Sequence, residues 1–167
     1  TVADQSNNTS TCQTTITIKD ELAPEVLCQD VTVQLDDNGQ LSITTALIDN
    51  GSNDACNIAI LALDKSQFSC ADVGENTLML TATDENGNTS SCEAQVLVQD
   101  LTPPRVFCYE GTVNLNAEGV VEITPYSIEV DKYDACGIAS REVSPTSFNC
   151  NQIGENEVTI TATDNNG

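Results

Sequence analysis

Aspartates that recur at a fixed spacing are the side chains best suited to chemistry in this sequence. They form three pairs with the same separation along the chain: Asp20 and Asp100, Asp54 and Asp134, and Asp84 and Asp164. Calcium takes about six to eight oxygen ligands from carboxylates, amides and carbonyls. A formal net charge of −21 also favours bound cations. We therefore expect structural Ca²⁺ at these aspartates, although Asp and Asn in loops also form turns without any ion. Further candidate ligands are Glu75, Asn86, Asn166, Asp49 and Asp131.

Eight cysteines form the second set of reactive side chains, and they recur at the same spacing as the aspartates. The sequence holds no His and no Cys-x-x-Cys pair, so structural disulfides are favoured over a zinc site. Disulfides persist mainly outside the cytoplasm, which predicts an extracellular or cell-surface protein. The eight are Cys12, Cys28, Cys56, Cys70, Cys92, Cys108, Cys136 and Cys150.

The composition argues against several functions. The net charge of −21 disfavours nucleic acid and anionic membranes as partners. No apolar run approaches the roughly 20 residues of a membrane-spanning helix. Without His, hydrolysis would need a carboxylate pair that stands apart from the repeat, and we find none, so we do not expect an enzyme and assign no catalytic residue. Four Asn-x-Ser/Thr sequons on predicted loops are glycosylation candidates, at Asn7, Asn8, Asn50 and Asn88.

Strands of period two should position these residues. The segments "NTLMLTATD" (76–84), "CEAQVLVQD" (92–100), "VTVQL" (31–35) and "LSITTALI" (41–48) alternate apolar and polar positions, and no helical period is sustained. The first places Leu78, Leu80 and Ala82 on one face. Turn sequences "DDNG" (36–39) and "NAEG" (116–119) separate such runs. The pattern predicts an all-β fold of tandem immunoglobulin-like β-sandwich domains with an 80-residue repeat. In that fold the loops that carry the three aspartates of each set meet at the end where the chain enters.

Two stretches have the composition of joints between domains. "KDELAP" (19–24) and "QDLTPP" (99–104) place an acidic residue and then proline directly after a predicted strand. We therefore predict a complete repeat over residues 20–99 and a second repeat over residues 100–167 that lacks its last strand. Residues 1–19 are then the closing strand of a preceding repeat, or a strand donated to a neighbouring chain. We favour a stretch of a longer tandem array over strand donation.

The order of the motifs resembles that of the hyalin repeat (HYR). It runs from "PEVLC" and "PRVFC" through "DACNI" and "DACGI" to "FSC" and "FNC", followed by Gly-Glu-Asn and "TATDENGN" before a cysteine. This resemblance implies an immunoglobulin-like module of secreted and cell-surface arrays of the bacterial type. It implies a non-catalytic adhesin, stalk or fibril whose partners are neighbouring repeats or identical subunits. One alternative is a filament in which residues 1–19 complete residues 100–167 of the next chain. Another is a carbohydrate-binding module that uses Phe107, Tyr109, Tyr126 and Tyr133.

The fold that this resemblance implies also suggests disulfide pairs. Four cysteines in each domain allow three connectivities. In an immunoglobulin-like sandwich the first and last strands are neighbours, which favours Cys28–Cys92. Two further cysteines flank the middle hairpin of each repeat, which favours the pairs Cys56–Cys70 and Cys136–Cys150. Cys12 and Cys108 then have no partner within their own domains. Under strand donation they would bond to each other across the junction between chains.

Overall fold

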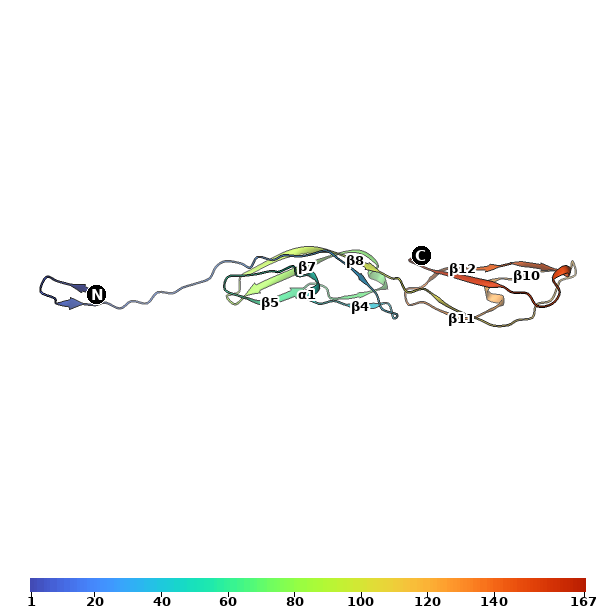
Figure 1. Cartoon of the computed structure of the whole chain (residues 1–167), viewed down its shortest axis with the longest axis horizontal. Coiled ribbons are helices and arrows are strands. Elements are labelled where there is room, and N and C mark those ends of the chain that lie inside the picture. Colours follow the sequence, from blue (N-terminus) through green and yellow to red (C-terminus); the bar gives the residue numbers. More distant parts are fainter.

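The computed structural model describes the backbone of residues 1–167 and all side chains except those of residues 129–132. Figure 1 shows an elongated chain: a small N-terminal hairpin, an extended segment and two β-rich units follow one another along the long axis. The α-helix, α1 (Thr45–Ile48), is a single turn. The expectation of a mostly β, disulfide-bonded chain is therefore confirmed at this level.

The N-terminal hairpin pairs β1 (Val2–Ala3) with β2 (Thr9–Ser10). Asp4 closes its turn, because its Oδ1 atom accepts the backbone N–H groups of Ser6 at 2.8 Å and Asn8 at 2.9 Å. Residues 11–24 form no strand and are almost entirely exposed. The predicted closing strand at 1–19 therefore lies apart from both units.

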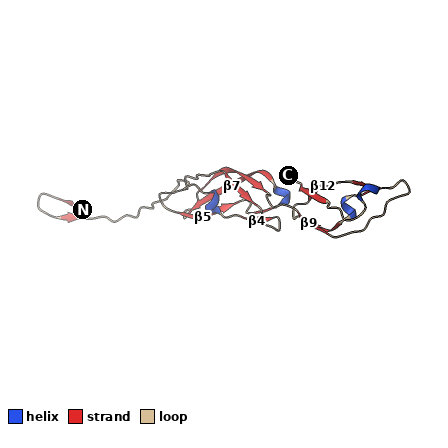
Figure 2. Ribbon diagram, turned by 45° about the vertical axis from the view of Figure 1, so that its right-hand side comes forward, coloured by secondary structure: helices blue, strands red, loops and turns tan.

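The first unit contains a four-stranded sheet in the order β3-β8-β7-β5. Strand β3 runs parallel to β8, whereas β7 is antiparallel to both β8 and β5. A second pairing joins β4 to β6, and Figure 2 shows how these strands fill the unit. The bounds are β3 (Val31–Gln34), β4 (Gln40–Ser42), β5 (Ile58–Leu63), β6 (Gln67–Ser69), β7 (Gly74–Asp84) and β8 (Thr89–Gln99).

The core of the first unit follows the predicted period of two. The inward positions of β7 and β8 are at most 1% exposed, namely Leu78, Leu80, Ala82, Ala94, Val96 and Val98. All except Ala82 belong to one cluster with Phe68 and Ile48. One expectation is corrected, because the strand predicted over 41–48 ends at Ser42 and α1 begins at Thr45. The helical turn changes the side-chain period, so Ile48 is buried while Leu47 is 37% exposed.

The second unit consists of three two-stranded pairings: β9 with β11, β10 with β13, and β12 with β14. Two of them reproduce pairings of the first unit one repeat later. Leu41 faces Phe68 in β4·β6, and Val121 faces Phe148 in β10·β13. Its core is small and centres on Ile123, Val143 and Phe148. The bounds are β9 (Arg105–Cys108), β10 (Val120–Glu122), β11 (Glu129–Tyr133), β12 (Ile138–Ser144), β13 (Ser147–Asn149) and β14 (Thr159–Asp164).

Single turns of 3₁₀ helix recur as well. They are η1 (Cys70–Asp72) and η3 (Cys150–Gln152) at equivalent places in the two units, and η2 (Pro125–Ser127) in the second. The Ser69 N–H donates to Asp72 Oδ2 at 2.8 Å, and the Asn149 N–H donates to Gln152 Oε1 at 3.0 Å. The turns η1 and η3 are therefore capped by their own side chains, and each carries a cysteine at its first position.

Candidate metal centres and the joint between the units

Three aspartates meet at the joint between the two units. Asp100 follows β8, Asp134 follows β11, and Asp164 is the last residue of β14. One carboxylate oxygen from each lies within 4.8 Å of the others. Asp100 and Asp164 are each only 7% exposed. The structure thus brings together the three residues that the sequence predicts to converge, and this group could hold a metal ion.

Local hydrogen bonds fix one oxygen of each carboxylate. The Oδ1 atoms accept backbone N–H groups two residues further on, from Thr102 at 3.1 Å, Cys136 at 2.9 Å and Asn166 at 2.8 Å. These are Asx turns, which Asp forms readily.

The second oxygens of Asp100 and Asp134 differ in their hydrogen bonding. The side-chain amide of Asn166 donates to Asp100 Oδ2 at 3.0 Å. Asp134 Oδ2 is buried and, among the described residues, has no hydrogen-bond partner. A buried carboxylate oxygen without a partner is costly, because its hydration has been lost and nothing replaces it. A cation at this point would provide the missing interaction for Asp134.

Electrostatics favour a cation at the same place. Carboxylates that share a partly buried site repel one another unless a positive charge lies between them. The guanidinium of Arg105 lines the groove beside Asp134, but its ion pair at 3.8 Å is with the exposed Asp37 of the first unit. That pair is largely solvated and therefore weak. A divalent ion is the group best suited to offset the charge of the three aspartates.

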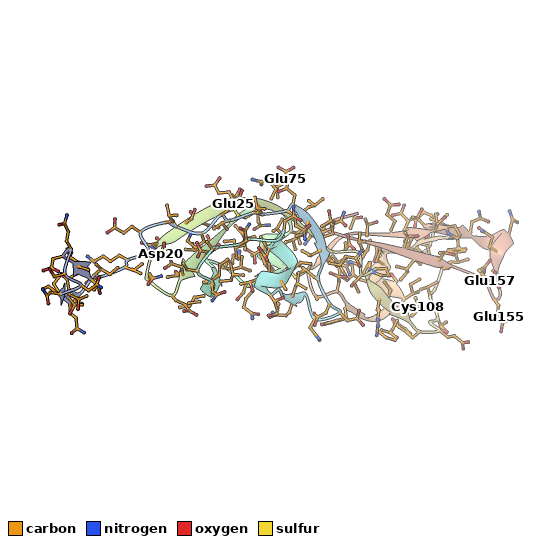
Figure 3. All side chains as sticks on the ribbon, turned by 60° about the vertical axis from the view of Figure 1, so that its left-hand side comes forward. Asp20, Glu25, Glu75, Cys108, Glu155 and Glu157 are labelled. Carbon is orange, nitrogen blue, oxygen red and sulfur yellow. A yellow bond between two sulfur atoms is a disulfide. The ribbon has the colours of Figure 1, made fainter. Side chains whose placement is uncertain are left out.

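The second cluster lies at the other end of the first unit, where the extended segment enters it (Figure 3). Here ligand atoms of Asp20, Asp54 and Cys56 lie within 4.8 Å of one another. The carboxylate of Asp20 raises the pKa of the Cys56 thiol, first by hydrogen bonding and then by charge repulsion. A raised pKa disfavours the thiolate, which is the form of cysteine that binds metals.

Asp84, the third aspartate predicted for this cluster, lies beside it. Burial alone would raise the pKa of Asp84, but hydrogen bonds from Asn88 and Asn86 outweigh it and bring the pKa below the ordinary 3.8. The amide of Asn88 donates to Asp84 Oδ2 at 2.7 Å and to the Asp20 carbonyl at 3.3 Å. Asn86 donates to Asp20 Oδ2 at 3.2 Å. Asparagine amides therefore connect Asp84 to Asp20 without bringing the two carboxylates into one group.

Two other predicted ligands belong to neither cluster among the described residues. Glu75 is exposed on β7, opposite Leu97 of β8 (Figure 3). Asp49 accepts the Ser52 N–H at 2.9 Å within its own loop. The side chain of Asp131 lies outside the described residues.

One predicted disulfide is present. Cys28 is bonded to Cys92 with a Cα–Cα distance of 5.9 Å, and both pack against the core of the first unit. This pairing agrees with the neighbouring positions expected for the first and last strands.

The predicted pairs Cys56–Cys70 and Cys136–Cys150 are wrong. Cys70 is instead bonded to Cys136, with a Cα–Cα distance of 5.1 Å, and so links η1 of the first unit to the loop after β11 of the second. The physical reason is that β5 and β6 do not form a hairpin but pair with β7 and β4. Cys56 therefore lies beside Asp20, and Cys70 lies at the opposite end of the unit beside Gly39. The remaining cysteines are exposed and unpaired within the described chain: Cys12, Cys56, Cys108 and Cys150.

The predicted glycosylation sites differ in accessibility. Asn7, Asn8 and Asn50 are exposed, with Asn7 at a φ of 65° in the β1–β2 turn. The amide of Asn8 donates to Asp4 Oδ2 at 2.9 Å. Asn88 is half-buried, and its amide already bonds Asp84 and Asp20. Glycosylation at these sites stays a prediction.

The aromatic side chains proposed to bind carbohydrate lie on the second unit. Tyr109 donates its hydroxyl to the Ser127 carbonyl at 2.8 Å. Tyr126 is 74% exposed, and the guanidinium of Arg141 stacks over its ring at 4.5 Å. Phe107 and Tyr133 are 56% and 53% exposed. Carbohydrate binding stays a prediction.

Comparisons with protein-family models, with curated proteins and with solved structures each give no match. No helix in the described part of the chain has the length and apolar character that a membrane crossing requires. The two disulfides are typical of an oxidising environment.

Proposed function

We propose that this protein is a non-catalytic structural module of an extracellular stalk, adhesin or fibril, built from tandem immunoglobulin-like sandwich repeats. In this proposal a disulfide and a bound Ca²⁺ fix each joint between repeats. The observation that carries the proposal is that a single joint holds both the Cys70–Cys136 bond and the cluster of Asp100, Asp134 and Asp164. The resemblance of the motif order to the hyalin repeat supports the same function.

A joint of this kind resists bending because several connections act together. The chain crosses from one unit to the next through Asp100 and the prolines at 103 and 104, whose φ angles are fixed. The disulfide forms a second covalent connection between η1 and the loop after β11. An ion held by Asp100, Asp134 and Asp164 would be a third connection, because Asp100 directly follows β8 of the first unit whereas Asp134 and Asp164 belong to the second. Stiffness at the joint is the property that an extracellular spacer needs.

Calcium fits this donor set better than a softer metal. The three ligand side chains are all carboxylates and offer only oxygen, the donor that Ca²⁺ prefers. Extracellular modules bind Ca²⁺ with dissociation constants of about 10⁻⁴–10⁻³ M, which is adequate where calcium is abundant. A chain with a net charge of −21 would also gain from the neutralisation.

The experiment compares unfolding with Ca²⁺ and with EDTA. Tyrosine fluorescence reports on the second unit alone, because the three tyrosines are Tyr109, Tyr126 and Tyr133 and the chain has no Trp. At a Ca²⁺ concentration 100-fold above the dissociation constant, binding should stabilise the fold by about 2.7 kcal/mol. The Asp134→Asn variant should lose this gain, whereas the matched control Glu157→Gln, an exposed carboxylate in the same unit, should keep it.

Small-angle X-ray scattering on the same samples tests the stiffness. Ca²⁺ should narrow the distribution of distances between the two units, and Asp134→Asn should not respond. Equal midpoints and equal scattering with Ca²⁺ and with EDTA would overturn the calcium joint. A strong response that survives in Asp134→Asn would place the ion elsewhere and would equally overturn it.

A further inference from the structure

A groove lies at the joint between the two units, whose position along the chain is visible in Figure 1. One wall is the turn between β3 and β4 of the first unit, with Asp37 and Asn38. The other wall belongs to the second unit and contains Arg105 and Tyr133, and Thr102 of the linker lies between the walls. The groove has a volume of about 180 Å³. Pockets for drug-sized molecules hold about 300–1,000 Å³, so this groove suits a smaller group, such as a single sugar ring.

Arg105 and Tyr133 enter the groove from two paired strands. Tyr133, the last residue of β11, lies directly opposite Arg105, the first residue of β9. Residues that face each other in an antiparallel pair place their side chains on the same side of the sheet. Tyr133 is 53% exposed, and no described residue forms a hydrogen bond with its hydroxyl group. Its ring is therefore an available platform for the apolar face of a ligand.

The guanidinium of Arg105 is available as well. Its ion pair with Asp37 spans 3.8 Å, and the two side chains are 68% and 78% exposed. A solvated pair at this distance is weak, so most of the five N–H donors of the guanidinium face water. A ligand in the groove can therefore replace this water without breaking a strong ion pair.

The facing wall is a turn that its own hydrogen bonds hold in place. Asp36 Oδ1 accepts the backbone N–H groups of Asn38 and Gln40, both at 2.9 Å. The turn presents the Asp37 carboxylate and the Asn38 side chain to the groove. The backbone that carries these polar groups is therefore fixed before any ligand binds, which lowers the entropic cost of binding.

Two contacts hold the walls at a constant separation. The Cys70–Cys136 disulfide joins η1 of the first unit to the loop that follows Tyr133. Close packing joins the same segments, since a Cβ at Gly39 would come within 3.1 Å of the Ala135 Cβ. The groove is thus a built feature of the joint and not a gap between two independent units.

The fold does not require the pair of Arg105 and Tyr133, because the first unit has other side chains at the equivalent positions. Glu25 and Asn53 stand there, and they pair through two backbone N–H···O bonds of 2.9 Å. The Asn53 amide also donates to the Glu25 carboxylate at 3.2 Å, so those two side chains satisfy each other. Arg105 and Tyr133 instead leave their polar groups open to the groove. A ligand at the joint explains this difference.

We propose that the groove binds a neutral sugar residue of a glycan, whose ring packs on Tyr133 and whose hydroxyl groups bond Arg105 and Asp37. A hydroxyl group both donates and accepts, so neighbouring sugar hydroxyls can use the guanidinium, the carboxylate and the Asn38 amide together. A neutral sugar fits better than an acidic one, because the carboxylates of Asp37 and Asp134 outnumber the single guanidinium. The site goes beyond the structural joint and does not depend on bound Ca²⁺.

The test is a sugar titration of the isotope-labelled full chain, followed by two-dimensional amide NMR spectra. The neutral probes are the methyl glycosides of mannose, galactose and N-acetylglucosamine, and methyl glucuronide is the acidic comparison. EDTA is present throughout. A sugar ring with its hydroxyl groups has about 12 non-hydrogen atoms, so a neutral probe should bind with a dissociation constant on the order of 1 mM. The shifted amides should lie on both walls and include Asn38, Thr102 and Arg105.

The double variant R105E/Y133N gives the groove the pair that the first unit carries. Because Glu25 and Asn53 support the same backbone pairing there, the variant should keep its fold in a circular dichroism melt. It should weaken sugar binding by at least about tenfold, the factor that hydrogen bonds to a charged group supply. The matched control Tyr126→Ala removes a tyrosine of the same unit that is 74% exposed and lies outside the groove, and its binding should equal that of the wild type.

A second variant tests the other wall. Asp37→Ala changes an exposed side chain of the turn, so it should leave the fold intact and weaken binding by a smaller factor. It also decides the question if R105E/Y133N does not fold.

Three outcomes would overturn the proposal. The first is that no neutral probe shifts amides on both walls at concentrations well above the millimolar range. The second is binding that folded R105E/Y133N or Asp37→Ala leaves unchanged, which would place the sugar elsewhere. The third is binding of methyl glucuronide alone, which would show a site for anions. A calcium response without sugar binding, or sugar binding without a calcium response, separates this proposal from the calcium joint.

Discussion

Loss of the Cys70–Cys136 disulfide should destabilise the second unit far more than the first. The double variant C70A/C136A removes the covalent connection between η1 and the loop after β11. The first unit keeps its own bond, Cys28–Cys92, and a core of nine buried residues. Among the described side chains, the buried core of the second unit consists of Ile123, Val143 and Phe148. The unit with the smaller core depends more on the constraint.

The magnitude follows from the length of chain that the bond closes. Its cysteines are 66 residues apart. On the chain-entropy model a loop of this size is worth about 4 kcal/mol at 25 °C, which is an upper estimate. The Cys28–Cys92 bond spans 64 residues, so the same model gives nearly the same value for C28A/C92A. If the two variants differ in the order in which their units unfold, the difference therefore reflects the location of the bond and not the loop length.

Urea unfolding monitored by two signals distinguishes the units. Tyrosine fluorescence follows the second unit only, and far-UV circular dichroism follows both. C70A/C136A should move the tyrosine transition to much lower urea and leave the remaining dichroism transition close to that of the wild type. C28A/C92A should produce the opposite order. The reasoning would be refuted if the free energy of unfolding from the tyrosine transition of C70A/C136A lay within about 0.5 kcal/mol of the wild-type value, which is the range of a neutral surface substitution.

Three further predictions concern single residues. Leu80→Ala should lower the free energy of unfolding of the first unit by about 2–5 kcal/mol, whereas the exposed Met79→Ala should change it by less than about 0.5 kcal/mol in the same dichroism assay. The folded-state pKa of Asp84 is depressed, so the ionised carboxylate stabilises the fold above the ordinary pKa of 3.8, and this stabilisation is lost as the pH falls through the folded-state pKa. The urea midpoint of Asp84→Asn should therefore depend less on pH in that acid range than the wild-type midpoint. Equal pH dependence of the two midpoints would contradict this. Gly39 has a φ of +70°, and an added methyl would overlap Cys70 Sγ, so Gly39→Ala should cost about 1–2 kcal/mol or more in urea unfolding and should raise the free thiol content.

The strands and the acidic clusters were accessible from the sequence because both follow short-range or periodic rules. The alternation in 76–84 and 92–100 predicts the buried faces of β7 and β8, and the burial of Leu78, Leu80, Val96 and Val98 confirms it. Asp100, Asp134 and Asp164 each follow an equivalent aspartate of the first repeat at the same separation, which predicts that the three serve one site. Their carboxylates do lie together.

The disulfide across the joint and the turn α1 could not be read from the same rules. Pairing of Cys70 with Cys136 depends on how two units approach each other, and the local spacing of cysteines carries no record of that approach. The turn over Thr45–Ile48 contains β-branched residues that favour strands, and tertiary packing of Ile48 overrides this preference. Cys56 in the Asp20 cluster was missed because it was assigned to a disulfide, although its position two residues after Asp54 was a usable signal.

The recurring Asp-Ala-Cys motif explains why the joint takes this form. In residues 134–136 the aspartate accepts the cysteine N–H at 2.9 Å, so one turn fixes both the carboxylate and the direction of the thiol. Asp54 accepts the Cys56 N–H at 2.7 Å in the same way. A small residue between them permits close approach, since a Cβ at Gly39 of the facing unit would come within 3.1 Å of the Ala135 Cβ.

The opposite end of the second unit carries the counterpart of that facing surface. A Cβ at Gly119 would come within 2.8 Å of Cys150 Sγ, just as one at Gly39 would overlap Cys70 Sγ. Gly119 also has a positive φ, of +76°, as Gly39 does. The sequence therefore maintains, beside an unpaired thiol, the clearance that an Asp-Ala-Cys turn uses at the joint already formed.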